Sequence, residues 1–248
     1  MKVAVCISHV PDTATRVKIG QDEKLIDPTG VVYIINPYDE FAVEEALKTK
    51  EKFGGEVIAI SVGNENSKES IRKALAMGVD KGILLKTEKI LDSFGIARAL
   101  ADEIKAQQCE IVFMGKQSVD YDDSIVGQIT SELLGFSCIS NVVDLKIEGQ
   151  KLFAEREIEG GKEVVESETP AVITAQKGLN EPRYASLKGI MASKKKEILE
   201  KLIPDTENLT EVLRMRKPVA KQPGRIIGTD VSAVPELVRL LHEEAKVI

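Results

Sequence analysis

The residues best suited to bind a ligand lie in one polar loop, 115–124, with the sequence GKQSVDYDDS. The apolar run 111–114 precedes this loop, and an amphipathic segment, 124–134, follows it. This order predicts a buried strand, a loop and a helix with one buried face. Because the first turn of a helix has free backbone N–H groups and a positive partial charge, the pattern suits a phosphate.

The same pattern also fits an ordinary connection between a strand and a helix. Asp122, Asp123 and Ser124 are good N-cap residues for the predicted helix. The two aspartates could instead hold Mg²⁺, although adjacent acidic residues more often cap a helix. The chain has neither a GxxxxGK(S/T) nor a GxGxxG motif, so no common nucleotide motif chooses between these interpretations. The helix residues expected to face the core are Val126, Ile129, Thr130 and Leu133.

Few other residues are placed to carry out catalysis. Ser8, His9 and Asp12 lie close together after the first apolar run, which leaves a hydrolase open as an alternative. This segment lacks the glycines of the Ser-Gly-Gly-x-Asp-Ser loop with which adenylating enzymes cleave ATP. The chain has two histidines and three widely spaced cysteines in or beside apolar runs, so we expect no metal site.

Composition and periodicity predict an α/β fold. Among 248 residues, 43% are hydrophobic and 30% are charged, as in ordinary globular proteins. No run of about 18 apolar residues occurs, so membrane insertion is not expected. Short apolar runs alternate with helical patterns, which predicts a doubly wound, mostly parallel sheet. The expected strands are 2–7, 56–62, 81–85, 110–114 and 170–175, and the expected helices are 36–52, 67–77, 92–107 and 124–134.

We expect these five strands in the spatial order 3-2-1-4-5. The winding of such a sheet reverses between strands 1 and 4, and ligands bind at the carboxyl ends of the strands at that point. The loop after Ile7 and the loop after Met114 would then face each other across a crevice. The topology therefore places the polar loop 115–124 at the predicted ligand site.

The second half of the chain has a different pattern. Alternating segments separated by glycine turns predict an antiparallel meander at about 137–168, as a β extension of the sheet. A short hairpin is also expected around 17–19 and 31–34. Residues 183–225 hold 11 basic and 5 acidic residues in a chain of net charge −6, which indicates an interaction element. Acidic net charge and an aromatic content of 4% argue against nucleic acid as its partner.

This pattern divides the chain into three parts. Residues 1–180 form the α/β domain with its meander, and residues 181–197 form a basic segment. Residues 198–248 have too little apolar surface to fold alone, so we expect a C-terminal arm, with a short helix at 232–245.

Four stretches in this order resemble the beta subunit of electron transfer flavoproteins. They are 36–46 (NPYDEFAVEEA), 74–78 (ALAMG), 115–117 (GKQ) and 180–196 (NEPRYASLKGIMASKKK). Each stretch is a weak signal alone, but the ordered set is specific. The resemblance runs from residue 1 to about 200 and continues weakly to the end.

The resemblance implies two nucleotides. The beta subunit would hold a structural AMP in the crevice between strands 1 and 4, with largely backbone contacts on the adenine side. An alpha subunit would hold most contacts to a redox-active FAD. By match, the AMP-binding residues are Cys6, Asn36, Pro37, Tyr38, Asp39, Val62, Gly115, Lys116, Gln117, Ser118, Val119, Asp120, Tyr121, Asp122, Asp123, Ser124, Ile125 and Val126.

The resemblance also implies partners. The chain would be an electron carrier subunit without catalysis of its own, in an obligate heterodimer with the alpha subunit, which the arm 198–248 would wrap. The heterodimer would pass electrons from acyl-CoA dehydrogenases of fatty acid oxidation to a membrane electron transfer flavoprotein-quinone oxidoreductase. Residues 181–197 would recognise the dehydrogenase, with Leu187 as the anchor. The implied recognition residues are Arg183, Tyr184, Leu187, Ile190, Met191, Lys194, Lys195 and Lys196.

The sequence departs from the family pattern in the AMP loop. Where many members read Asp-Asp-Ser-Asn-Gln-Thr-Gly, residues 122–127 read DDSIVG, which keeps backbone contacts and leaves side-chain contacts open. Thr13 stands where some members have an aromatic residue near the flavin. An electron-bifurcating branch binds a second FAD in place of AMP, but Tyr121 replaces the small glycine of its Asp-Gly-Asp loop.

A stand-alone nucleotide-binding protein of the universal-stress type is another alternative, since it shares the sheet order. The meander and the basic segment argue against it. We expect a cytoplasmic protein in a bacterium, or a protein of the mitochondrial matrix in a eukaryote.

Overall fold

The computed structural model describes residues 1–204, 206–221 and 223–248. Asp205 and Gln222, two positions of the predicted arm, lie outside the described residues. The chain forms two compact units, Met1–Leu213 and Arg214–Ile248. Among the described residues, no helix has the length and apolar character needed to cross a lipid bilayer.

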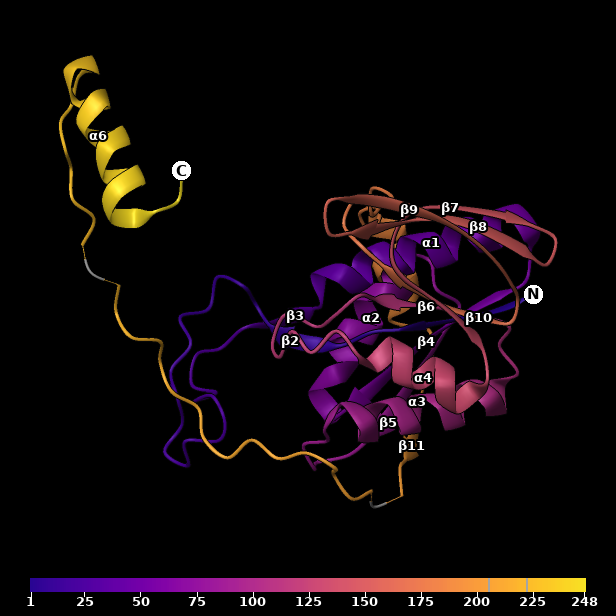
Figure 1. Cartoon of the computed structure of the whole chain (residues 1–248). Coiled ribbons are helices and arrows are strands. Elements are labelled where there is room, and N and C mark those ends of the chain that lie inside the picture. The colour runs from indigo at the N-terminus through magenta and orange to yellow at the C-terminus, as the bar shows by residue number, and fades with distance from the viewer. Residues whose placement is uncertain (205, 222) are drawn as a thin grey trace. The chain divides into compact units, whose positions relative to one another are not determined.

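A nine-stranded sheet forms the centre of the first unit, in the order β11-β5-β4-β1-β6-β10-β7-β8-β9 (Figure 1). Its five strands β5-β4-β1-β6-β10 are parallel and have the predicted order 3-2-1-4-5. The doubly wound α/β fold is therefore confirmed, and its winding reverses between β1 and β6. The strands are β1 (Lys2–Cys6), β4 (Glu56–Gly63), β5 (Lys81–Lys86), β6 (Ile111–Gly115), β7 (Ser137–Glu148), β8 (Lys151–Ile158), β9 (Gly161–Glu168), β10 (Ala171–Ala175) and β11 (Ile198–Leu202).

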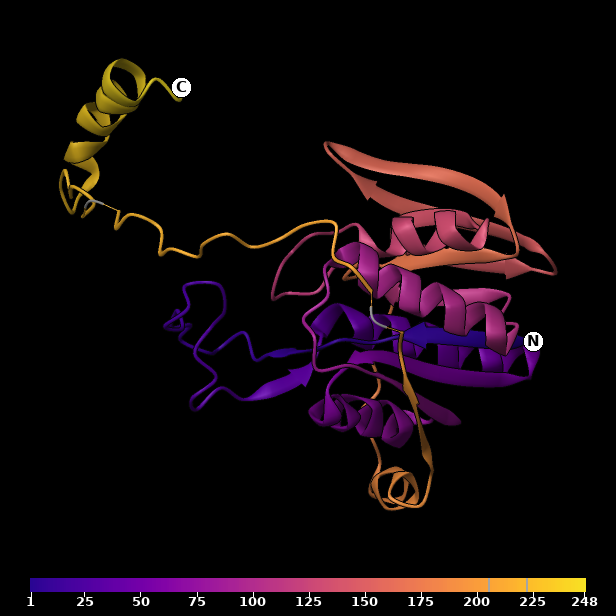
Figure 2. The same cartoon turned by 90° about the horizontal axis from the view of Figure 1, so that it is seen from below.

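Helices cover both faces of the parallel strands (Figures 1 and 2). The four main helices are α1 (Pro37–Phe53), α2 (Lys68–Met77), α3 (Ser93–Gln107) and α4 (Val126–Leu134). Val5 and Phe113 pack in the core cluster beneath α1 and α2, whereas Cys6 and Met114 pack in the cluster beneath α3 and α4. Because both faces are buried, the strands are continuous apolar runs, which is why the sequence shows them clearly.

The start of α1 follows the sequence prediction. Pro37 occupies its first turn, Asn36 is its N-cap, and Asp39 and Glu40 lie in the first turn, where acidic residues complement the helix dipole. The Asn36 side chain makes no capping hydrogen bond, however. It donates instead to the Asp39 carboxylate and to the backbone carbonyl of Gln117.

The predicted meander is confirmed, and it continues the main sheet. β7 pairs antiparallel with β8, and β8 with β9. The first half of β7 pairs parallel with β10, so one long strand belongs to both the parallel and the antiparallel part.

The N-terminal hairpin differs from the prediction. β2 (His9–Pro11) pairs with β3 (Tyr33–Ile35), whereas the predicted partner at 17–19 makes only an isolated bridge between Ile19 and Ile26. The second predicted segment, 31–34, overlaps β3, but its partner is the segment that directly follows β1.

The C-terminal segment also differs at its start. The sequence places residues 198–202 in the arm, yet they form β11, which pairs parallel with β5 at the edge of the sheet. Lys201 Nζ lies 2.7 Å from Oε1 of Glu103, a carboxylate that is 6% exposed. Ile198 packs against the core, whereas Leu199 and Leu202 remain exposed, so an edge strand with one half-buried face was read as part of the arm.

The second unit, taken by itself, contains η2 (Val231–Ala233), α6 (Val234–Leu240) and η3 (Leu241–Ala245). These elements confirm the predicted short helix near 232–245. Arg239 pairs with Glu236 and Glu243 on the helix surface.

A glycine sets the depth at which α4 packs on the sheet. A Cβ at Gly127 would lie 2.5 Å from Thr174 Cγ2 and 3.2 Å from Met114 Sδ. This close approach also explains why Leu133, a predicted core residue, remains 43% exposed, since α4 turns Gly127, Thr130 and Ser131 to the sheet instead.

We expect Gly127→Ala to destabilise the protein by about 1–3 kcal/mol, because overpacking outweighs the better helix propensity of alanine. Gly161→Ala is the control, because a Cβ there has no neighbour within 4 Å. Urea unfolding of both variants measures the difference. Equal stability of the two variants would contradict the close packing of α4.

Candidate functional site

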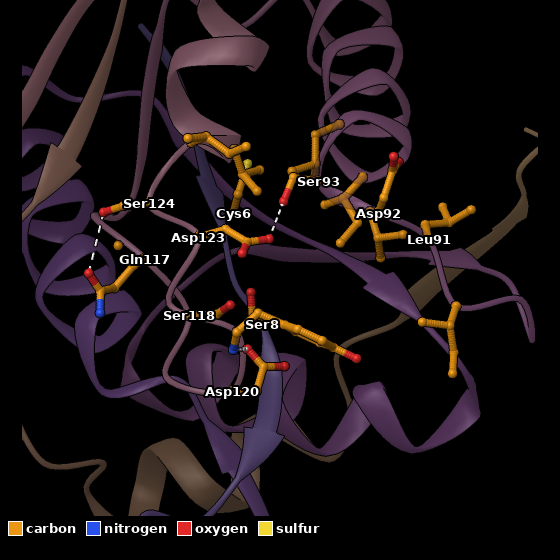
Figure 3. A pocket seen from close by; sticks show the side chains of 18 of the residues that line it. Cys6, Ser8, Leu91, Asp92, Ser93, Gln117, Ser118, Asp120, Asp123 and Ser124 are labelled. Atoms are coloured by element: carbon orange, nitrogen blue, oxygen red, sulfur yellow. Dashed lines mark hydrogen bonds between the residues drawn. The ribbon is translucent and has the colours of Figure 1, made fainter. Parts of the chain in front are cut away.

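A cavity of about 530 Å³ opens at the carboxyl edge of the parallel strands (Figure 3). The ends of β1, β4 and β6 form its floor, with Cys6, Val62 and Met114 in its wall. Its volume falls in the range typical of small-molecule sites, roughly 300–1,000 Å³. The cavity lies where the winding of the sheet reverses, which is the place that the topology predicts for a ligand.

A buried carboxylate joins the loops beside this cavity. Asp39, which is 3% exposed, accepts hydrogen bonds from Ser8 N at 2.7 Å, from Gly115 N at 2.9 Å and from Asn36 Nδ2 at 2.9 Å. These donors come from the loop after β1, the end of β6 and the start of α1. One side chain therefore fixes three segments relative to one another.

Asn36 extends this connection into the polar loop. It is fully buried; its Nδ2 donates to Gln117 O at 2.8 Å, and its Oδ1 accepts from Val119 N at 3.2 Å. A Cβ at Gly115 would lie 2.4 Å from Asp39 Oδ1, so the start of the loop requires glycine. The loop 115–124 is thus held from beneath by buried polar groups.

Burial perturbs the titration of two groups at the floor. It raises the pKa of Asp39 to about 7, while the hydrogen bonds from Asn36, Ser8 and Gly115 act to lower it. Burial, followed by the nearby charge of Asp39, raises the pKa of the Cys6 thiol well above its usual value. Cys6 is therefore a neutral thiol at physiological pH and not a nucleophile.

Hydrogen bonds within the polar loop fold it back upon itself. Ser124 Oγ lies 3.2 Å from Lys116 O and 3.3 Å from Gln117 Oε1. Ser93 Oγ donates to Asp123 Oδ2 at 2.6 Å and links the loop to α3 (Figure 3). Asp122 and Ser124 have positive φ angles of 56° and 57°.

The predicted capping of α4 by Asp122, Asp123 or Ser124 is wrong. Ile125 occupies the N-cap position, with no side-chain capping bond, because the three polar side chains bond elsewhere. Ile125, Val126 and Gly127 line the cavity. The wall therefore contains a helix N-terminus that no side chain among the described residues caps.

Most of the residues singled out in the sequence for AMP binding lie in this wall. These are Cys6, Asp39, Val62, Gly115, Lys116, Gln117, Ser118, Asp120, Tyr121, Asp123, Ser124, Ile125 and Val126. The remaining residues, which do not line the cavity, are Asn36, Pro37, Tyr38, Val119 and Asp122. Asn36 acts from beneath the loop, and the Tyr38 ring lies 5.2 Å below Lys116 Nζ.

The other lining residues were not among the predicted AMP-binding residues, although the sequence placed the loops after Ile7 and Met114 at this crevice. They are Ile7, Ser8, His9, Asp22, Lys24, Leu25, Ile90, Leu91, Asp92, Ser93, Ile96, Leu100, Met114, Gly127, Asn208, Thr210, Glu211 and Val212. The loop 90–93 follows β5, so the predicted topology already placed it at the correct edge. No local pattern marks residues 208–212, which reach the cavity only through the tertiary fold.

The cavity wall combines an apolar part with acidic groups. Val62, Leu91, Ile96 and Leu100 supply apolar surface. The carboxylate and amine groups that line the cavity are those of Asp22, Asp39, Asp92, Asp120, Asp123, Glu211, Lys24 and Lys116. Within the described part of the chain, no group of three or more potential ligands is placed to hold a metal ion. A phosphate here would depend on backbone N–H groups more than on cations.

The arrangement of His9 does not support the hydrolase alternative. His9 Nδ1 lies 2.9 Å from Ser70 Oγ, and its ring stacks on Tyr33 at 5.2 Å. Ser70 is 2% exposed and cannot meet a substrate, while Asp12 bonds to Ala14 N. The structure thus does not form the Ser8, His9 and Asp12 constellation.

A second feature, the segment 180–196, lies on the outer sides of α1 and α2. Arg183 donates through Nε and Nη2 to Glu44, whose side chain is 5% exposed, and it also bonds to Glu51. Burial would raise the pKa of Glu44, but the bonds and charge of Arg183 hold it below its usual value. Arg183 is therefore an internal anchor.

The helix α5 (Leu187–Ser193) is held against α2. Arg72 Nη1 donates to Ser193 O and to Lys196 O, the latter at 2.6 Å. Lys196 Nζ bonds to the carbonyl groups of Leu75 and Val79 at the end of α2. A Cβ at Gly189 would lie 2.3 Å from Ala76 O, so the two helices meet at their backbones.

This packing leaves a group of exposed side chains on and beside α5. Tyr184 is 98% exposed, Leu187 82% and Met191 70%, while Ile190 is 42% exposed. Lys194 and Lys195 are also exposed, unlike Lys196. Of the predicted recognition residues, Arg183 and Lys196 serve internal contacts, and the others face outward.

Comparison with known proteins relates these features to a family. A family model described as the electron transfer flavoprotein domain matches residues 24–205. The chain is 40% identical to the electron transfer flavoprotein subunit beta of Bradyrhizobium diazoefficiens, over the full length of both chains. It is 38% identical to that of Bacillus subtilis over both full lengths, and 37% identical to the human protein over 100% of this chain and 99% of the relative.

The raised pKa of Asp39 predicts a pH dependence of folding. The folded protein binds this proton more tightly than the unfolded chain, so stability falls as pH rises from about 4 towards 7. Relative to Asp39→Asn, which does not titrate, the wild-type free energy of unfolding should decrease by a few kcal/mol over this window, at about 1.4 kcal/mol per pKa unit. Urea unfolding at several pH values measures this, and a constant difference between the proteins would refute it.

Proposed function

Because the chain belongs to the electron transfer flavoprotein family, among its beta subunits, we propose that it binds AMP in the cavity and docks electron donors through α5. A role in electron transfer follows from membership of the family. The AMP would be structural, since no lining group is placed to react with it. The uncapped N-terminus of α4 at the reversal of the sheet is the observation that carries this proposal.

The chemistry of the cavity wall fits an adenine mononucleotide. The first-turn N–H groups of α4 and the backbone of the loop 115–124 can bind a phosphate without a cation. The apolar side chains of Val62, Leu91 and Ile96 can pack on a base. Carboxylates such as Asp120 and Asp123 can accept hydrogen bonds from ribose hydroxyl groups.

A second FAD in place of AMP would make the chain part of an electron-bifurcating protein. Tyr121 lines the cavity, and residues 208–212 close another side of it. These groups occupy space that a larger dinucleotide would need. We therefore favour AMP and retain the second FAD as an outcome of the test below.

The redox-active FAD would be held mainly by an alpha subunit in an obligate heterodimer. The second unit of this chain, 214–248, would contribute the arm that wraps the alpha subunit. On its helix, Val234, Leu237 and Val238 are 44–49% exposed, although they are apolar. Such side chains are expected where a second chain covers them.

The exposed group on α5 would dock the electron donor. Leu187 and Met191 provide an apolar anchor, and Lys194 and Lys195 provide charge that steers an acidic partner. Acyl-CoA dehydrogenases are the proposed donors, and a membrane electron transfer flavoprotein-quinone oxidoreductase is the proposed acceptor. We propose that the chain works in the bacterial cytoplasm or, in a eukaryote, in the mitochondrial matrix.

The content of the purified heterodimer tests the nucleotide proposal. Heat should release AMP and FAD in equimolar amounts, because one chain holds each nucleotide, and liquid chromatography can quantify both. Twice as much FAD with no AMP would support the bifurcating alternative. A protein that purifies without a flavin-binding partner would contradict the proposal altogether.

The docking proposal predicts a specific effect of Leu187→Ala. Burial of one leucine in a partner pocket contributes roughly 1.5–3 kcal/mol, so the variant should raise the KM for a dehydrogenase by about tenfold or more. The flavin spectrum and reduction by dithionite should not change, because α5 contacts α2 and not the nucleotide cavity.

Leu202→Ala is the matched control, because Leu202 is 84% exposed but lies on β11. This variant should be reduced by the dehydrogenase with wild-type kinetics. Equal effects of the two substitutions, or no effect of Leu187→Ala, would show that α5 is not the docking element.

A further inference from the structure

The chain after β11 returns to the nucleotide cavity. Residues 208–212 lie along its mouth, where Asn208, Thr210, Glu211 and Val212 are part of the wall. We refer to residues 208–212 as the strap. Its contacts belong to the first unit of the chain, Met1–Leu213.

One carboxylate holds the strap in place. Asp92 Oδ2 accepts hydrogen bonds from Leu209 N at 2.7 Å, from Thr210 N at 2.8 Å and from Thr210 Oγ1 at 3.1 Å. The other oxygen of Asp92, Oδ1, caps α3 by accepting from Gly95 N at 2.9 Å. Asp92 therefore connects the strap to the start of a core helix.

Asn208 makes the reciprocal contacts. Its Oδ1 accepts from Asp92 N at 3.2 Å, and its Nδ2 donates to Ile90 O at 2.9 Å. The strap and the loop 90–92 thus exchange hydrogen bonds in both directions. Burial would raise the pKa of Asp92, but the bonds from Gly95, Thr210 and Leu209 outweigh it and lower the pKa, so the acceptor is ionised at neutral pH.

The strap also reaches the opposite rim of the cavity. Glu211 pairs with Lys24, which belongs to the loop between β2 and β3 and lines the cavity with Asp22 and Leu25. The strap therefore bridges two loops that are otherwise separated by the cavity mouth.

The strap buries little apolar surface. Within it, Leu209 is 68% exposed and Val212 41%, and Leu213, which follows it, is 79% exposed. Segments with few buried apolar contacts open locally at a low cost in free energy. The polar contacts of the strap are therefore the main barrier to opening, and the Asp92 side chain accepts three of them.

We propose that Asp92 is a latch that holds the strap over the cavity and so retains the bound nucleotide. The inference rests on the proposed AMP site and adds its regulation, because exchange of the nucleotide would require release of the strap. Asp92 acts as a positioning residue through the strap, and the C-terminal segment becomes part of the nucleotide site.

The test measures release of radiolabelled AMP from the purified heterodimer into excess unlabelled AMP. Asp92→Ser keeps a side chain that can cap α3 but is too short to reach the strap. Because hydrogen bonds to a charged group are among the strong ones, this variant should release AMP about tenfold faster or more. Thr210→Val, which loses only the hydroxyl bond, should accelerate release about threefold to tenfold.

Leu213→Ala is the matched control, because Leu213 follows the strap, is 79% exposed and does not line the cavity, so this variant should release AMP at the wild-type rate. Amide hydrogen exchange at residues 209 and 210 gives an independent readout, and it should rise in Asp92→Ser while exchange in α3 stays unchanged. Wild-type release rates in Asp92→Ser, with AMP bound, would overturn the latch alone. Absence of AMP from the wild-type heterodimer would overturn the nucleotide proposal and the latch with it.

Discussion

The site depends on one buried interaction, the set of three N–H donors around the Asp39 carboxylate. A carboxylate that is 3% exposed is costly unless each oxygen has partners, so its donors cannot move independently. Those donors belong to the loop after β1, the end of β6 and the start of α1. The interaction therefore fixes the segments on both sides of the point where the sheet winding reverses. Asn36, which donates to Asp39, also bonds to Gln117 O and Val119 N and so fixes the loop 115–124.

On the outside of the molecule, cationic side chains hold the segment 183–202 in place by bonding to acceptors on buried residues. Arg183 on Glu44, Lys196 on the carbonyl groups of Leu75 and Val79, and Lys201 on Glu103 are each bonded to an acceptor on a buried residue. These contacts hold the segment from 183 to 202, including α5 and β11, which has little apolar surface of its own. If α5 docks a partner as proposed, its being already ordered would lower the entropy lost on binding, which would favour affinity. Its exposed residues are thus held in place by internal ion pairs and by hydrogen bonds to backbone carbonyls.

The acidic wall of the cavity is compatible with the proposed tightly bound nucleotide. Cations would attract any free phosphate compound, whereas backbone N–H groups and a fitted apolar surface select one shape. The strap adds a closure on the solvent side, formed by a chain segment that is 117 residues distant from Asp92 in sequence. Retention by closure and recognition by the backbone together suit a structural nucleotide.

The sequence by itself determined the sheet order, the main helices and the place of the polar loop 115–124. Strands buried on both faces are continuous apolar runs, which makes them visible in the sequence, and crossover connections have one hand, which limits their order. It could not decide which polar side chains turn inward. Asn36 and Asp39 fit a helix start equally well whether they cap it or tie loops together, and Asp122 to Ser124 fit a cap that the folded loop does not use. Lys196 cannot be told from Lys195 in a run of three lysines. The strap has no local signal at all, because its partner, Asp92, comes from a distant segment. Only the tertiary structure sets these contacts, since a polar side chain takes whichever partner the fold brings within hydrogen-bonding distance.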